Sequence, residues 1–208
     1  ECITSCKNPP EIWFNSSTAT IYRHETERPN NEQNGIFGEG FSVEIAKSWE
    51  KAFFDFELKT TRQIALRMTI ILGKNGGAMQ PLVNLAKLGL GGQQGKGSQY
   101  FSWLHIKDLF SIIQFCIQNK TIIGSINCGS PNAIQNSTLM KALRTKVGMP
   151  FGVPIPEFLL KVGAILINTE AELVLKSRWI EPKTLIDNGF KFEFEYIEDA
   201  LIDVLKRN

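Results

Sequence analysis

Residues 64–73 read Ile-Ala-Leu-Arg-Met-Thr-Ile-Ile-Leu-Gly, and this stretch decides the fold class. Its apolar, partly β-branched run is short and stops at a glycine, which predicts a buried strand. A second apolar run, at 11–15, ends in Ser16-Ser17-Thr18 and predicts another buried strand that stops at a hydroxyl-rich turn. Helical patterns lie between and after these runs, and strands that alternate with helices predict an α/β fold.

Two further periodic patterns give specific expectations. Phe41, Ile45, Trp49 and Phe53 recur at every fourth position, so they form one stripe of a helix that we expect to pack in the core. Residues 190–194 alternate strictly between aromatic and charged side chains. This alternation predicts a half-buried strand.

The most glycine-dense stretch, residues 89–97, reads Gly-Leu-Gly-Gly-Gln-Gln-Gly-Lys-Gly. A dinucleotide-binding loop follows a strand and opens a helix, so that the pyrophosphate meets the helix N-terminus. This stretch instead follows a helical pattern at 79–88 and precedes strand-like residues at 100–103. It is therefore predicted to be a structural turn.

Composition excludes several classes of protein. The 208 residues are 43% hydrophobic and 21% charged with a net charge of +2, which is typical of a globular domain and not of a basic nucleic-acid binder. No apolar run approaches the roughly 18 residues of a membrane helix. The four cysteines lack zinc-ligand spacing and, without a secretory signal, predict reduced thiols in a cytoplasmic protein with no metal.

Several motifs together resemble one known family. They are Phe14–Tyr22, Trp49-Glu50, Gly89-x-Gly91-Gly92-x-x-Gly95-x-Gly97-x-Gln99-x-Phe101-Ser102-Trp103-x-His105-x-x-Asp108-Leu109, Pro131-Asn132, Ser177-Arg178, Pro182-Lys183 and Gly189-Phe190-Lys191-Phe192. The chain resembles the atypical short-chain dehydrogenase/reductase family of the sugar-nucleotide epimerase-like kind, within the NAD-dependent epimerase/dehydratase superfamily. The resemblance covers nearly the whole chain.

The resemblance implies an architecture: the C-terminal half of a Rossmann-type, doubly wound parallel sheet plus a small mixed α/β domain on the substrate side. Residues 1–73 correspond to the remaining part of the dinucleotide-binding domain. Residues 74–150 form a substrate-side segment with a return strand and helix, and residues 151–208 form the small C-terminal domain. The family's Gly-rich pyrophosphate loop would precede Glu1 by about a hundred residues, so we expect an N-terminally truncated chain.

Enzymes of the wider class use a Ser or Thr hydroxyl, a Tyr and a Lys, and the resemblance places Thr18 at the hydroxyl position. Aligning Glu50 with the family's helix places the Tyr position at Ser42 and the Lys position at Ala46. Neither residue can replace the dyad, because alanine carries no charge and a serine hydroxyl is too weak an acid. Alternatively, the hydroxyls at 16–18 only satisfy backbone groups at a strand end.

Four more residues are candidates for the cofactor side. Tyr22 is a surrogate acid/base or a ring that stacks on nicotinamide; the alternative is a core aromatic with a hydrogen-bonded tip. Ser16 and Ser17 are predicted to contact the cofactor. Arg67 is predicted to bind a diphosphate or another acidic group, or else to be the buried ion-pair partner of Glu50.

Gln99, Trp103 and His105 are predicted to bind the substrate, because the family's matching segment faces the substrate cleft. His105 and Asp108 are spaced i, i+3 across a strand-to-helix junction, where Asp108 can accept from the His105 ring or cap the helix. A structural role for His105 is the alternative. We expect the Thr18 turn and this junction to line opposite walls of one cleft.

The functional expectation is an NAD(P)-binding, epimerase- or oxidoreductase-like protein with NAD or NADP as cofactor. It would act on a nucleotide-sugar-like or other polar small molecule, without the usual dyad and with no nucleic-acid or membrane partner. Two alternatives stay open: a non-catalytic dinucleotide-binding or regulatory protein, and an inactive truncated fragment.

Overall fold

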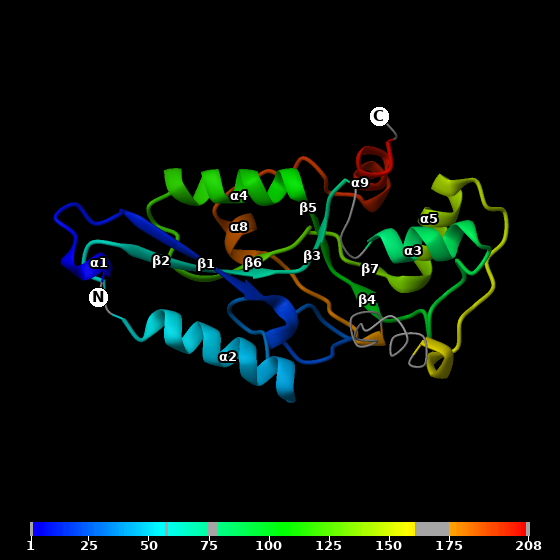
Figure 1. Ribbon diagram of the computed structural model, residues 1–208, viewed down its shortest axis with the longest axis horizontal. Coiled ribbons are helices and arrows are strands. Elements are labelled where there is room, and N and C mark those ends of the chain that lie inside the picture. The colour runs from blue at the N-terminus through cyan, green and yellow to red at the C-terminus, as the bar shows by residue number, and fades with distance from the viewer. Residues whose placement is uncertain (1, 57, 75–78, 161–174, 207–208) are drawn as a thin grey trace.

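The structure is a computed structural model that describes residues 2–56, 58–74, 79–160 and 175–206. Its elements are, in chain order, α1 (Cys2–Ser5), β1 (Ile12–Thr18), the 3-10 turn η1 (Ala19–Ile21), α2 (Phe41–Phe54), β2 (Arg62–Met68), β3 (Ile70–Leu72), α3 (Met79–Lys87), β4 (Tyr100–Phe101), β5 (Trp103–His105), α4 (Ile106–Gln118), β6 (Gly124–Cys128), β7 (Ile134–Gln135), α5 (Asn136–Val147), α8 (Lys183–Asp187) and α9 (Ile197–Val204). The molecule is elongated, with the main sheet in one half and α3, α5 and α9 in the other (Figure 1).

The main sheet has three parallel strands in the order β1-β2-β6. β1 and β2 pair from Ile12 opposite Arg62 to Thr18 opposite Met68. Both strands therefore end side by side at the same edge of the sheet. The predicted α/β class with a parallel sheet is confirmed.

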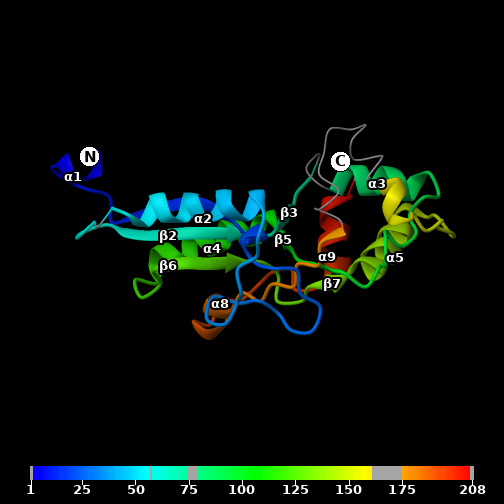
Figure 2. The same cartoon turned by 90° about the horizontal axis from the view of Figure 1, so that it is seen from below.

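Helices cover both faces of this sheet, with α2 on one side and α4 on the other (Figures 1 and 2). On the α2 face, the Trp13 and Phe53 rings meet edge to face at 4.9 Å. On the α4 face, Ile64, Ile112 and Cys116 belong to one buried apolar cluster. A sheet covered on both faces explains why the middle of β2, Ile64 to Leu66, is apolar and buried.

The predicted packing of α2 is wrong for most of its aromatic stripe. Phe53 is buried, but Phe41 is 83% and Trp49 53% exposed, and Ile45 is exposed as well. The helix instead faces the sheet through Ala46, which is 0% exposed and lies about 100° around the helix from Ile45. Alanine has almost no side chain, so the helix can approach the strands closely there, whereas Phe41, Ile45 and Trp49 are left at the surface.

The other half of the molecule is a second apolar cluster built by α3, α5 and α9. Its glycine-rich segment, residues 89–97, follows α3 and bonds to a neighbouring extended segment. The Gly92 N–H donates to the Val153 carbonyl at 3.2 Å, and the Gly95 N–H donates to the Ile155 carbonyl at 2.9 Å. The predicted structural role of this stretch is therefore confirmed.

The predicted strand at 190–194 is wrong, although its burial alternates as expected. Phe190 and Phe194 are buried. The Glu193 and Phe194 N–H groups donate to the Asp108 carboxylate at 2.8 and 3.1 Å. The Asp108 carboxylate therefore accepts the hydrogen bonds that the carbonyls of a neighbouring strand would otherwise accept. The two roles considered for Asp108, acceptor for the His105 ring and cap of its own helix, are therefore replaced by the bonds to Glu193 and Phe194.

Arg62, at the start of β2, anchors the C-terminal end of α4. Its guanidinium donates to the carbonyls of Cys116, Asn119 and Ile122 at 3.0–3.1 Å and to that of Ile117 at 3.3 Å. These carbonyls lie where a helix runs out of its own N–H donors, and where a positive charge also meets the negative end of the helix dipole.

Arg62→Met is therefore expected to lower the free energy of unfolding by about 2 kcal/mol, since hydrogen bonds from a charged group contribute roughly 1.5–3 kcal/mol. Urea denaturation followed by circular dichroism measures this change. Arg62→Lys is the control, because it keeps the charge but not the several donors of the guanidinium. Its loss of unfolding free energy should lie between zero and that of Arg62→Met. A Met variant as stable as the wild type would contradict the anchoring role.

Candidate functional site

A cavity of about 140 Å³ opens where β1 and β2 end. Thr18 is the last residue of β1, and Met68 is the last residue of β2. The described residues that line the cavity are Thr18, Ala19, Thr20, Met68, Thr69, Ile70, Tyr100, Phe101, Ser102, Lys176, Arg178 and Ile180. The carboxyl edge of a parallel sheet is where open α/β folds bind their ligands.

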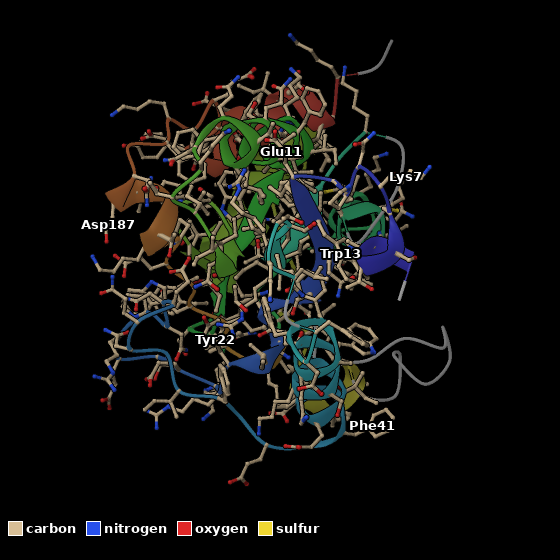
Figure 3. The ribbon with its side chains drawn as sticks, turned by 90° about the vertical axis from the view of Figure 1, so that its left-hand side faces the viewer. Lys7, Glu11, Trp13, Tyr22, Phe41 and Asp187 are labelled. Carbon is tan, nitrogen blue, oxygen red and sulfur yellow. The ribbon has the colours of Figure 1, made fainter. Side chains whose placement is uncertain are left out.

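A second cavity, of about 290 Å³, lies against α2. Its described lining residues are Thr18, Thr20, Phe41, Ser42, Ile45, Trp49 and Arg178. The exposed side of α2 thus forms one wall, and Phe41, which is labelled in Figure 3, begins that helix. Thr18, Thr20 and Arg178 line both cavities, so the two spaces meet at these residues.

The Thr18 side chain is held in place at this meeting point. Its hydroxyl oxygen accepts a hydrogen bond from the Thr20 N–H at 3.1 Å and donates to the Thr20 hydroxyl at 3.0 Å. Thr18 thereby caps the 3-10 turn η1. For Thr18 the structure shows the alternative role, in which the hydroxyl satisfies a backbone group, and Thr18 also lines both cavities.

The wall opposite Thr18 comes from β4 and from the segment that leads into α8. The Arg178 N–H donates to the Tyr100 carbonyl at 2.9 Å, and the Ser102 hydroxyl donates to the Arg178 carbonyl at 2.6 Å. The Tyr100 ring stacks on Trp179 with 3.9 Å between centroids. Sequence reasoning did not select Tyr100, Ser102 or Arg178 as site residues. The available signals were Ser102 in the motif Phe101-Ser102-Trp103 and the Ser177-Arg178 pair in the C-terminal motif.

A buried polar network lies under α2, behind the second cavity. The Glu50 carboxylate accepts from Arg67 Nε and Nη2 at 2.8 and 2.7 Å, from the Ser17 hydroxyl at 2.6 Å and from the Ser125 hydroxyl at 2.9 Å. Burial raises the pKa of Glu50, but the hydrogen bonds from Arg67, Ser17 and Ser125 and the Arg67 charge outweigh it, and the net pKa is lowered. Glu50 is therefore ionised in the folded chain at neutral pH.

Tyr22, which is labelled in Figure 3, belongs to the same network through its hydrogen bond with Arg67. Its hydroxyl accepts from Arg67 at 2.7 Å and donates to Asn127 at 3.0 Å, and burial raises its pKa despite the Arg67 charge. The structure shows Tyr22 as a core aromatic with a hydrogen-bonded tip, and Arg67 as the buried ion-pair partner of Glu50; both are the alternatives considered from the sequence. Neither residue lines the two cavities, nor do Ser17, which is buried, and Ser16, which is exposed. The catalytic role of Tyr22 and the cofactor contacts of the other three stay predictions.

The three residues predicted to bind the substrate are buried behind the cavity wall. Gln99 donates to the Gln94 carbonyl at 2.7 Å, Trp103 donates to the Asn132 carbonyl at 3.2 Å, and His105 is 1% exposed. None of the three is among the residues lining either cavity. The cavity wall that we expected Trp103–Asp108 to form is formed instead by Tyr100–Ser102. The substrate contacts of Gln99, Trp103 and His105 stay predictions.

His105 connects α4 to α9. Its Nδ1 accepts from the Lys107 N–H at 3.2 Å, its Nε2 lies 3.3 Å from an Asp203 carboxylate oxygen, and its ring stacks on Phe194 at 3.8 Å. Burial lowers the pKa of His105 more strongly than the charge of Asp203 raises it. The folded chain therefore favours the neutral ring, which can accept from Lys107.

A lowered histidine pKa means that the unfolded chain binds this proton more tightly. The free energy of unfolding should therefore fall as the pH drops below about 6.5, the ordinary value for histidine. Denaturation midpoints between pH 5 and 7.5, a range of about one to two units around that value, measure the slope. His105→Asn, which retains an acceptor, should flatten it. His24→Asn removes the other histidine and is the control; equal flattening by both would contradict this assignment.

Some kinds of site have no counterpart among the described residues. No group of three or more His, Cys, Asp or Glu side chains there could hold a metal ion. Burial raises the pKa of the Cys116 thiol to about 11, so it stays protonated at neutral pH. None of the helices in the described ranges is long and apolar enough to cross a membrane.

Comparisons with known proteins agree with this architecture. A family model described as a domain of unknown function, DUF1731, matches residues 155–204. The Arabidopsis thaliana protein "Epimerase family protein SDR39U1 homolog, chloroplastic" is 29% identical over 191 residues, which are 92% of this chain and 54% of that protein. The chain thus spans about half the length of this relative.

Two solved structures have the same fold. The human epimerase family protein SDR39U1 (isoform 2) with NADPH superposes with a TM-score of 0.85 at 24% identity, over 97% of this chain and 68% of that one. The nucleoside-diphosphate sugar epimerase from Corynebacterium glutamicum gives a TM-score of 0.78 at 24% identity, over 98% and 39%. The predicted resemblance to an atypical short-chain dehydrogenase/reductase of the epimerase-like kind, with a Rossmann-type sheet, is confirmed.

Proposed function

We propose that the chain binds the nicotinamide end of NAD or NADP and takes part in epimerase- or oxidoreductase-type chemistry on a polar small molecule, which includes nucleotide sugars. One observation carries the proposal: two cavities meet at the Thr18 side chain, at the carboxyl edge of a parallel sheet. The human structure similar to this chain contains NADPH, and the bacterial one is a nucleoside-diphosphate sugar epimerase by name.

The cavity against α2 fits the nicotinamide end of such a cofactor. Phe41, Ile45 and Trp49 supply apolar surface for a flat ring, and Ser42 and Thr18 supply hydroxyls at its rim. The proposal concerns this end of the cofactor and not the pyrophosphate. When bound, a nicotinamide donates or accepts a hydride.

The chain's own residues would hold the substrate and exclude water. The Thr20 N–H bond holds the Thr18 hydroxyl oxygen in place. The single Thr18 proton, which is donated to the Thr20 hydroxyl in the empty site, would turn to a substrate oxygen when the substrate binds. Arg178 lines the same junction and offers a positive charge for an oxygen that becomes more negative during reaction. Apolar side chains, including Ile70 and Ile180, limit access of water to that oxygen.

Binding of NADPH and NADH to the chain tests this proposal directly. Trp49 lines the proposed ring site, so its emission should be quenched by energy transfer to a reduced nicotinamide, and Trp49→Phe should remove most of that quenching. Trp13→Phe is the matched control, because Trp13 packs on Phe53 and does not line the cavity. Equal quenching losses in both variants, or no binding of either cofactor, would refute the nicotinamide site.

A non-catalytic, dinucleotide-binding protein is the second candidate. The observation that favours it is the fully buried Ala46 at the position of the family's lysine, with Ser42 at that of the tyrosine. Turnover of NADPH with any member of a panel of carbonyl compounds would exclude it. The cytoplasmic location stays a prediction, and the plant relative is chloroplastic by name.

A further inference from the structure

The outer edge of β1 is an open edge of the main sheet. β1 stands at the end of the strand order β1-β2-β6, and no other strand of the described ranges pairs with it. Trp13 of β1 and Asp187 of α8 lie on opposite sides of the sheet, so this edge faces away from α8 (Figure 3). Natural proteins protect such edges with charges, prolines or bulges, because the free backbone groups can pair with another strand. β1 contains no charged residue and no proline.

The backbone groups of every second residue in β1 point outward from this edge. The Arg62 N–H donates to the Glu11 carbonyl at 2.9 Å, so the backbone of Glu11 faces β2. The pairing with β2 then continues without a break, and backbone groups alternate between the two sides of a strand. The even-numbered residues of β1 therefore present their N–H and carbonyl groups at the open edge, and among them the Ser16 side chain is exposed as well.

An apolar stripe on α2 lies beside this edge. Four exposed residues recur at spacings of three or four and share one side of the helix: Phe41, Ile45, Trp49 and Ala52. The charged residues of α2 fall outside this stripe, since successive residues of a helix are about 100° apart. One of them, Glu50, accepts from Ser125 of β6, so the charged side of α2 is turned toward β6. The stripe is consequently turned toward the open edge, where it lines a cavity together with Thr18 of β1.

We propose that the β1 edge and the α2 stripe form the interface of a symmetric dimer, in which β1 pairs antiparallel with β1 of a second copy. Pairing centred on Asn15 overlaps all of both strands and sets Phe14 opposite Ser16 of the second copy, so that two residues with outward backbone groups exchange hydrogen bonds. A twofold axis brings a surface against itself. This surface suits such pairing, because neither β1 nor the stripe contains charges that would meet their like.

The same axis brings the two α2 helices side by side. α2 packs on β1, where the Phe53 ring meets Trp13 and the Glu50 carboxylate accepts from Ser17. The middle of β1 therefore lies near Ala52, which places this small residue close to the axis, where two helices can pack closely. The stripe also lines the second cavity, so the second copy would cover the open side of that cavity.

Sedimentation velocity on the 208-residue chain without cofactor, over a range of protein concentrations, measures the dimer. Ala52→Lys should raise its dissociation constant about tenfold or more, because two like charges then meet near the axis. Ser16→Pro should also weaken the dimer, since it removes an outward N–H and no bond to β2. Leu88→Lys is the control: Leu88 is 74% exposed and follows α3 in the other half of the molecule, so the dimer should be unchanged.

Amide hydrogen exchange locates the interface. The outward N–H groups of Phe14 and Ser16 should exchange more slowly as the protein concentration rises, whereas those of Trp13 and Asn15, which face β2, should be slow at every concentration. If Ser16→Pro does not fold, Ala52→Lys and the exchange of the wild type still decide the question.

A chain that stays monomeric would overturn the proposal, and a strand of another α/β segment would then be the candidate occupant of this edge. Equal weakening by the control variant, or concentration-dependent protection only outside β1 and α2, would also overturn it. The dimer does not rest on the proposed function. Since its measurement uses no cofactor, either proposal can fail while the other holds.

Discussion

Glu50→Ala is expected to lower the free energy of unfolding by about 3–5 kcal/mol, because it leaves a buried guanidinium without its counter-charge. Glu50 and Arg67 are 8% and 7% exposed, and two nitrogens of Arg67 donate to the two carboxylate oxygens. Small domains have only about 5–15 kcal/mol of stability in total, so this loss would bring the chain close to unfolding. Guanidinium denaturation, followed by fluorescence, measures it.

Two further variants separate the ion pair from the helix that carries it. Glu44→Ala removes a carboxylate from the same helix, but Glu44 is exposed and pairs with Lys47 at the surface, so its loss should be much smaller. The double variant Glu50→Leu/Arg67→Met should be more stable than Glu50→Leu alone, because no charge then stays buried and unpaired. A double variant less stable than the single would contradict this account.

The sheet could be predicted from the sequence because β1 and β2 each contain a short apolar run, Ile12 to Phe14 and Ile64 to Leu66, that is bounded by polar or turn residues. The core stripe of α2 could not, since periodicity alone does not show which side of an amphipathic helix meets the sheet. Phe41 and Trp49 are as apolar as any core residue, yet Ala46 makes the closest approach. The segment 190–194 was misassigned for a different reason: the N–H groups of Glu193 and Phe194 are satisfied by Asp108, which is 85 and 86 residues away in the chain.

Only one wall of the candidate site, the wall that contains Thr18, was predicted from the sequence. Thr18 could be selected because the resemblance places it at the family's hydroxyl position, at the end of a strand that a local pattern also predicts. Arg178 could not, since its proximity to Thr20 depends on how the segment before α8 crosses over β4. Gln99, Trp103 and His105 were selected by motif, and a motif marks residues that stabilise a junction as readily as residues that contact a ligand.

Thr18→Val is expected to lower kcat/KM about a hundredfold in a carbonyl-reduction assay with NADPH, as the removal of one fixed donor to a reacting oxygen does in other enzymes. Valine keeps the shape of threonine and removes only the hydroxyl. Thr18→Ser keeps the hydroxyl and should retain most of the activity. The loss should appear in kcat more than in KM, because the bond to the substrate oxygen strengthens as that oxygen gains charge.

The same hydroxyl also caps η1, so a loss of activity must be separated from a loss of structure. Removing a cap costs about 1 kcal/mol of stability. Ser17→Ala is the matched control, because it removes the neighbouring hydroxyl of β1 and its bond to Glu50 but changes no residue of the cavity wall. It should therefore lower stability without lowering kcat. If Ser17→Ala and Thr18→Val reduced kcat equally, the integrity of the strand end would explain the effect, and Thr18 would have no direct part in the chemistry.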